Sequence, residues 1–185
     1  FEIMPRIAID MCVKHVPGTR DPVATMAPWY LLIELSTGGT ADAARAMMEG
    51  ILETGLETGD VLDATIADSG AQATMFWHIR HGLSEAQRPE GGSIKHDVSV
   101  PVALVPEFLD QAIAAVREMV PGCRPVPFGH MGDGNIHFNV SQPIGMDKAA
   151  FIDLWDAMND RVHDIVLSLG GSISAEHGIG RLKRD

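Results

Sequence analysis

Two histidines seven residues apart flank an Asp-Gly pair, and their spacing indicates metal chemistry. His130 and His137 enclose Asp133 and Gly134 within a run of strand-forming residues. Asp-Gly in such a run predicts a two-residue type I′ hairpin, because both central positions of that turn need positive φ. In that register residue 130 pairs directly with residue 137, and their Cβ atoms are about 4.5–5.5 Å apart on one face. The sequence therefore predicts two imidazoles placed to share a metal ion.

The same register divides the second strand of the hairpin into a polar and an apolar face. Asn135, His137 and Asn139 share one face, whereas Ile136 and Phe138 point to the other side, toward a core. A single histidine on a hairpin can also be a solvent-facing residue without a role. A pair of histidines beside two asparagines is harder to explain in that way, so we expect a polar site on this face.

A second candidate segment, residues 172–180, follows the last long helix expected in the chain. Its glycines at 178 and 180 permit close backbone approach or conformations closed to other residues. Glu176 offers the carboxylate that a catalytic divalent site often combines with two imidazoles. His177 would point elsewhere in an extended chain, which leaves it as a candidate base. By itself, however, this pair is more typical of exposed polar residues on a glycine-rich loop.

Helix and strand patterns alternate along the chain that must position these residues. Apolar residues at i, i+3 and i+4 predict amphipathic helices, with Met47, Met48 and Trp155 in the core. Alternating or short apolar runs bounded by Gly and Pro predict strands. The pattern indicates an α+β fold, a largely antiparallel sheet with helices packed on one face. The helices are expected over 1–18, 41–58, 71–86, 105–119 and 151–169, and the strands over 29–35, 61–67 and 94–100, besides the hairpin.

Length and composition favour one globular domain. The 185 residues are 45% hydrophobic and 21% charged, and their formal net charge of −11 argues against nucleic acid or an anionic membrane as a partner. Cys12 and Cys123 are isolated thiols, which is typical of a reducing compartment. No apolar run reaches the length of a membrane span. We therefore expect a protein of the cytoplasm or an organelle matrix.

Four motifs in a fixed order carry a resemblance to a known family. They are Trp77-x-x-Arg80, Lys95-x-Asp-Val-Ser-Val-Pro, the histidine hairpin at 130–137, and Ser-Ala-Glu-His-Gly-Ile-Gly at 174–180. Together they resemble the C-terminal domain of FAD-linked oxidases, a family with dehydrogenases of D-2-hydroxyglutarate, D-lactate and glycolate. The resemblance covers nearly the whole chain, and four ordered motifs do not agree by chance.

The resemblance implies a role for eight residues. Four residues after the arginine, where the family usually has threonine, this chain has Ser84. Serine keeps the hydroxyl but loses a methyl contact, and this departure bears on how well the site fits one particular diacid. An arginine fork and a lysine charge are suited to a second carboxylate, although without the motifs both would read as surface ion pairs. The implied roles are metal ligation by His130, His137 and Glu176, substrate binding by Arg80, Ser84, Lys95 and Asn139, and proton abstraction by His177.

By resemblance, residues 1–185 form the substrate- and metal-binding domain of a flavin-dependent D-2-hydroxyacid dehydrogenase. It would oxidise a dicarboxylate like D-2-hydroxyglutarate to the 2-oxoacid, with hydride transfer to FAD and with zinc as the expected metal. FAD would be held mainly by an N-terminal domain that the sequence does not contain. The resemblance also implies that a final C-terminal segment is absent, so we expect the chain alone to be inactive.

Further partners and several alternatives stay open at this point. An electron-transfer flavoprotein or a quinone would reoxidise the flavin, and a homodimer is one option for the assembly. The substrate could instead be D-lactate or glycolate. A His-His-Glu site could also activate water in a metallohydrolase. Outside enzymes, the chain could be a non-catalytic module that binds metal and acid. The compartment would be the cytoplasm in a bacterium or the mitochondrial matrix in a eukaryote.

Overall fold

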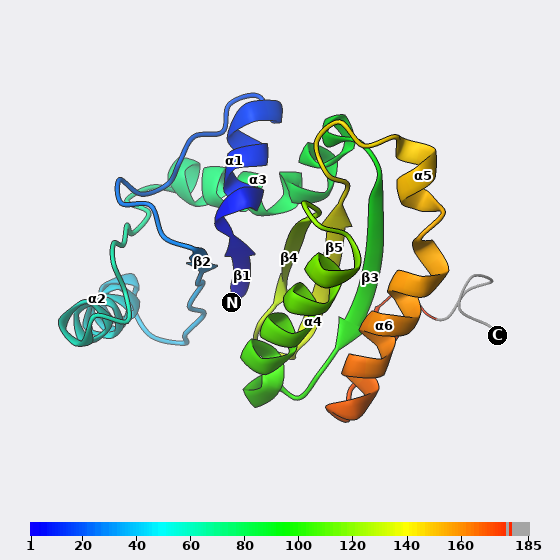
Figure 1. The fold of residues 1–185 in the computed structure, drawn as a ribbon. Coiled ribbons are helices and arrows are strands. Elements are labelled where there is room, and N and C mark those ends of the chain that lie inside the picture. Colours follow the sequence, from blue (N-terminus) through cyan, green and yellow to red (C-terminus); the bar gives the residue numbers. More distant parts are fainter. Residues whose placement is uncertain (177, 179–185) are drawn as a thin grey trace.

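Five strands form one antiparallel sheet in the order β2-β1-β4-β5-β3 (Figure 1). The computed structural model describes residues 1–176 and 178. The strands are β1 (Glu2–Pro5), β2 (Trp29–Leu32), β3 (Ser93–Ser99), β4 (Arg124–His130) and β5 (Asn135–Ser141). The helices are α1 (Arg6–His15), α2 (Ala41–Thr58), α3 (Gly70–Ala86), α4 (Val105–Met119), α5 (Lys148–Ile152) and α6 (Trp155–Ser168), with short 3₁₀ turns at Arg88–Glu90 and Val102–Leu104.

Helices cover both faces of this sheet, which confirms the α+β class but corrects the expectation of one covered face. Phe138 and Ile94 point to one side, where α4 and α6 complete the core. Val126 and Phe128 point to the other side, into a second core with α1 and α3 (Figure 1). Every residue of β1 is buried, so its strand needs cover on both faces. Helices α1 and α3 therefore pack on the face of the sheet that carries His137, because Phe128 is directly opposite His137 and belongs to the second core.

The first residues of the chain form a strand, not the start of the helix predicted over 1–18. Ile3 pairs with Leu31 of β2 and with Gly129 of β4, so β1 lies inside the sheet. The helix begins only at Arg6, after Pro5 in an extended conformation. Apolar residues at helical spacing also satisfy a buried strand, and here long-range pairing decides between the two. The result places residue 2 beside β4.

Other predicted boundaries agree with the structure to different degrees. The helices predicted over 71–86 and 105–119 and the strand over 94–100 match α3, α4 and β3 closely. The strand predicted over 29–35 ends at Leu32, and no strand forms over 61–67. The last predicted helix is divided into α5 and α6 at 153–154. The missing strand falls on a segment that contributes to neither core, whereas the division of the last helix falls on an element that packs against the main core.

Helix α2 forms as predicted, but its apolar stripe is not a core. Thr40 caps the first turn through a bond from Ala43 N at 3.2 Å, and Gly59 ends the helix with φ 79°. None of its residues is buried, and Met47 is 55% exposed. Met48 is only partly buried, so the prediction of two core methionines is wrong. Trp155 of α6, by contrast, packs against the main core.

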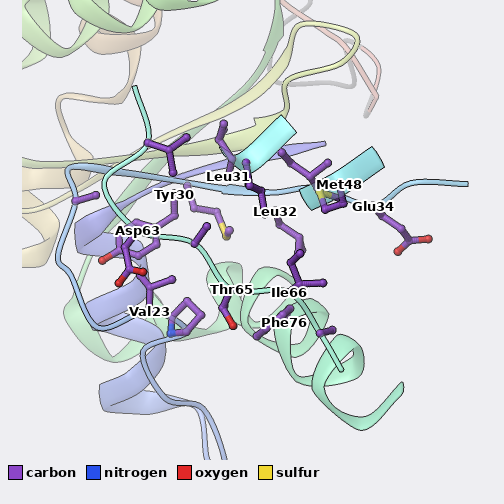
Figure 2. A pocket seen from close by; sticks show the side chains of 18 of the residues that line it. Val23, Tyr30, Leu31, Leu32, Glu34, Met48, Asp63, Thr65, Ile66 and Phe76 are labelled. Carbon is purple, nitrogen blue, oxygen red and sulfur yellow. The ribbon is translucent and has the colours of Figure 1, made fainter. Parts of the chain in front are cut away.

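A cavity of about 880 Å³ lies between β2, α2, α3 and the segment over 60–67. Figure 2 shows apolar side chains around it, among them Leu32, Met48, Ile66 and Phe76. Of the site residues predicted from the sequence, none that the structure describes contributes to its wall. The apolar cavity and the polar site are therefore separate places in the molecule. Among the described residues, no helix has both the length and the apolar character that a bilayer span demands.

Candidate functional site

The histidine hairpin has a four-residue turn, so the predicted two-residue turn is wrong. His130 pairs with Asn135 and Phe128 pairs with His137, which shifts the register by two residues. The carbonyl of His130 accepts from the backbone N–H groups of residues 133 and 134, at 3.3 and 3.1 Å. Gly134 alone takes positive φ there, and its carbonyl accepts from the N–H of residue 100 at 3.1 Å. Contact with the end of β3 thus favours the longer turn.

The shifted register still leaves both histidines on one face. A strand slip of one residue would reverse the faces, whereas a slip of two preserves them. His130 and His137 therefore become diagonal neighbours, with ring centroids 5.9 Å apart and ring planes at 74°. The ring of Phe128 lies beside them, 5.2 Å from that of His137. The predicted pair of imidazoles is therefore present, but the two histidines are diagonal neighbours and not the directly opposed pair that a two-residue turn would give.

Glu176 reaches the histidines because the chain after α6 runs antiparallel to the end of β3. Ser172 and Ser99 exchange two backbone hydrogen bonds of 2.8 and 2.9 Å. Farther along, the N–H of Glu176 donates to the Asp97 carboxylate at 2.8 Å. Its carboxylate then lies 3.2 Å from His130 Nε2 and 4.0 Å from His137 Nε2. Tertiary packing brings together three residues that the sequence separates by 46 positions.

These three side chains fit a divalent metal. One ligand atom from each of His130, His137 and Glu176 lies within 4.8 Å of the others. Two imidazoles and one carboxylate form a ligand set typical of catalytic zinc. Burial is the main cause that lowers the pKa of His137, and it outweighs the nearby Asp97 charge, which raises it. The imidazole therefore stays neutral near pH 7, as a metal ligand must.

Each histidine faces a carboxylate on the neighbouring strand, and the sequence motifs predicted neither of these two contacts. Glu2 of β1 is directly opposite His130, and its Oε1 lies 2.7 Å from Nδ1. Asp97 of β3 is directly opposite His137, with Oδ1 3.6 Å from Nδ1. Asp97 belongs to a motif that was recognised, but nothing in the sequence marked Glu2. Its role depends on the unexpected strand β1.

Arg80 lies in α3, over the same face of the sheet. Its Nε donates to Oε2 of Glu2 at 2.7 Å, and both residues are buried, with exposures of 8% and 6%. The guanidinium lies 5.0 Å from the ring centroid of Phe128. Because this bond uses Nε, the terminal N–H groups of the five-donor guanidinium remain suited to another acceptor. The structure thus places the predicted acid-binding arginine and the predicted metal ligand His130 on the same carboxylate, that of Glu2.

The other predicted substrate residues lie on the elements that carry Asp97, His137 and Arg80, namely β3, β5 and α3. Lys95 and Asn139 are direct cross-strand partners on the face that carries His137. Burial is the main cause that lowers the pKa of Lys95. Ser84 is exposed and lies one helical turn after Arg80 in α3. The predicted base, His177, lies outside the described residues.

The fold and the cluster together define a domain in which a sheet face holds two histidines and a carboxylate beside a buried arginine. Comparison with known families agrees with this description: the model of the FAD linked oxidases, C-terminal domain, matches residues 1–185. The chain belongs to this family.

Several relatives are called D-2-hydroxyglutarate dehydrogenase. The proteins from Xanthomonas citri pv. viticola and Stutzerimonas stutzeri are 36% and 38% identical over 100% and 95% of the chain. A mitochondrial protein from Arabidopsis thaliana is 34% identical over 99%. The matches span 38%, 38% and 31% of those three proteins, so the chain spans about a third of their length.

Proposed function

We propose that this chain is the substrate- and metal-binding domain of an FAD-dependent dehydrogenase that oxidises a D-2-hydroxyacid to the 2-oxoacid. The observation that carries the proposal is the His130, His137 and Glu176 cluster beside buried Arg80, in a chain of the FAD-linked oxidase family. A further domain would bind most of the flavin. The names of the bacterial and plant relatives favour the same reaction.

A divalent metal, with zinc as the best match, would be held by the two imidazoles and the carboxylate. When bound, such a metal supplies a Lewis acid for the 2-hydroxyl and carboxylate oxygens, and FAD supplies the acceptor for the C2 hydride. The residues that contact the two histidines also fit, because metal-bound histidines commonly donate their other N–H to a carboxylate. Glu2 and Asp97 are the carboxylates in those positions.

The cations beside the metal ligands favour a dicarboxylate. Arg80 offers a planar fork to the distal carboxylate, and Lys95 adds a point charge. Asn139 and Ser84 would supply polar contacts along the substrate. His177 would take the hydroxyl proton as the C2 hydride leaves, which balances the loss of two hydrogens from the acid. This preference is for a D-2-hydroxyglutarate-like substrate, with D-lactate and glycolate as the alternatives.

A substrate panel on the flavin-loaded enzyme tests the reaction. We expect dye reduction with D-2-hydroxyglutarate, and Arg80→Lys should raise KM for this dicarboxylate by about tenfold or more, since one charge-assisted bond contributes about 1.5–3 kcal/mol. KM for D-lactate should change much less, because D-lactate has no distal carboxylate. Hydrolysis without flavin reduction would refute the dehydrogenase and favour a metallohydrolase. An equal effect on both acids would remove the role of Arg80 in specificity.

Zinc analysis tests the ligands. We expect His130→Ala and Glu176→Ala to lose zinc, whereas His78→Ala, which removes an exposed histidine of α3, should retain it. Equal zinc content in all three variants and the unsubstituted protein would remove the proposed site.

The flavin must be reoxidised, so we also propose an electron-transfer flavoprotein or a quinone as acceptor. The relatives include bacterial and mitochondrial proteins, which supports the cytoplasm or the mitochondrial matrix as the compartment. A homodimer would be detected by sedimentation of the intact enzyme.

A further inference from the structure

One buried carboxylate connects the two halves of the site. Glu2 is 6% exposed, and its two oxygens are used in different directions. Oε1 lies 2.7 Å from Nδ1 of His130, and Oε2 accepts from Nε of Arg80 at 2.7 Å. The same side chain thus contacts a proposed metal ligand and the proposed anchor for the distal carboxylate of the substrate.

We propose that Glu2 is a positioning residue that holds His130 in the tautomer with its proton on Nδ1 and keeps Arg80 beside the metal ligands. This inference rests on the proposed function for the meaning of the site. A carboxylate accepts hydrogen bonds, so the nitrogen 2.7 Å away carries the proton. Nε2 of His130 then presents its lone pair toward Glu176, where the ligand atoms meet.

Backbone pairing fixes the position of Glu2. Glu2 and His130 are direct partners across β1 and β4, and β1 also pairs with β2 on its other side. The next backbone contact, from Met131 N to Phe1 O at 3.0 Å, extends this pairing. The sheet therefore holds the backbone of Glu2, and the contacts of its carboxylate with His130 and Arg80 leave little side-chain freedom to be lost when a metal binds.

The Arg80 contact adds a second function to the same carboxylate. A buried guanidinium without a counter-charge is costly, and Glu2 supplies that charge. Phe128 fixes the other side of the guanidinium, with its ring centroid 5.0 Å away. The carboxylate of Asp97 is 3.6 Å from His137 Nδ1, beyond direct hydrogen-bond distance, so Glu2 is the closer of the two partners.

The test compares Glu2→Ala and Glu2→Gln with Glu53→Ala, which removes an exposed carboxylate from α2. Zinc affinity of the 185-residue chain is measured by competition with a chromophoric chelator. Loss of a side chain that hydrogen-bonds to a metal-bound histidine typically weakens metal binding by about 10–100-fold. We expect about 100-fold for Glu2→Ala and about 10-fold for Glu2→Gln, whose amide oxygen still accepts from Nδ1. Glu53→Ala should bind like the unsubstituted chain.

A second measurement reports on the tautomer, which a merely structural role would not set. Long-range ¹H–¹⁵N spectra of the metal-free chain should show His130 with its proton on Nδ1, and Glu2→Ala should populate the Nε2 form. If Glu2→Ala does not fold, as its thermal unfolding would show, the tautomer of His130 in the unsubstituted chain and the zinc affinity of Glu2→Gln decide the question.

Two results would overturn the role of Glu2. One is a proton on Nε2 of His130 in the unsubstituted chain, and the other is zinc affinity within twofold of the Glu53→Ala control in both Glu2 variants. A chain that binds no zinc at all would refute the proposed metal site instead. In that case the tautomer measurement alone decides the role of Glu2.

Discussion

Replacing Asp97 by alanine should weaken zinc binding without removing any of the three proposed ligands. The carboxylate of Asp97 accepts from the N–H of Glu176 at 2.8 Å and so holds the segment that carries the third proposed ligand. A second bond, from Ala175 N to the backbone carbonyl of Asp97 at 3.2 Å, does not depend on the side chain. Asp97→Ala therefore loosens the Glu176 segment but leaves its course along β3.

The magnitude follows from the bond that is lost. A hydrogen bond to a charged group contributes about 1.5–3 kcal/mol, and each 1.4 kcal/mol changes an equilibrium constant about tenfold. We therefore expect the zinc Kd to rise by about 10–100-fold. Protonation of His137 does not contribute, because the Asp97 charge raises its pKa and removal of that charge lowers it further. The imidazole stays neutral at pH 7, so the effect is one of position.

Chelator competition at pH 7 measures the change, with Asp97→Asn as the matched variant. Asparagine keeps an acceptor oxygen for the N–H of Glu176, so its loss of affinity should be smaller than that of Asp97→Ala. Thermal unfolding of each variant shows whether the fold is intact. The reasoning is refuted if folded Asp97→Ala binds zinc within threefold of the unsubstituted chain while Glu176→Ala does not bind it.

Two further predictions concern stability. Bonds from Lys14 and two neighbouring basic side chains lower the pKa of Glu90 from 4.5 to about 2, so its stabilisation is complete above about pH 5 and is lost as the pH falls toward 2. Urea unfolding should show that Glu90→Gln is less stable than the unsubstituted chain by about 1–3 kcal/mol at pH 7. This difference in the free energy of unfolding should shrink below pH 5. A difference that stays constant with pH would contradict the prediction. In the hairpin, an added Cβ at Gly134 (φ +80°) would lie 2.0 Å from the Val100 carbonyl oxygen, whereas Gly145 has the same φ and open space. Gly145→Ala should lower the free energy of unfolding by about 1–2 kcal/mol through backbone strain alone. Gly134→Ala should lower it by clearly more, because the added Cβ also meets the Val100 carbonyl oxygen. Equal losses in urea unfolding would show that the contact with Val100 is not tight.

Strand β3 and helix α4, which both face the main core, were predictable from the sequence. The alternating apolar residues of β3 and the apolar stripe of α4 were both predicted correctly, because the apolar side chains of each element are buried in the same core. The first eighteen residues could not be assigned in this way. Ile3 and Met4 point to opposite faces of the sheet and enter different cores, which a period of 3.6 does not describe. The apolar stripe of α2 predicted a helix correctly but wrongly predicted core burial.

The site shows the same division. The residue types and their order indicated His130, His137 and Glu176 as candidate metal ligands, and the structure brings these three together. The ordered motifs indicated the family, and the comparison with known families confirms the family. The hairpin register was wrong by two residues. The histidines nevertheless share a face, because a strand repeats every two residues.

The sequence by itself thus determined which side chains could hold a metal and an acid, because ligand chemistry belongs to residue types and local spacing. Only the tertiary structure decided how they meet. Glu176 reaches the histidines through backbone bonds with β3, and Glu2 reaches His130 across β1 and β4, 128 residues away in the chain. Such contacts depend on sheet pairing between distant segments, and no local pattern specifies which segments pair.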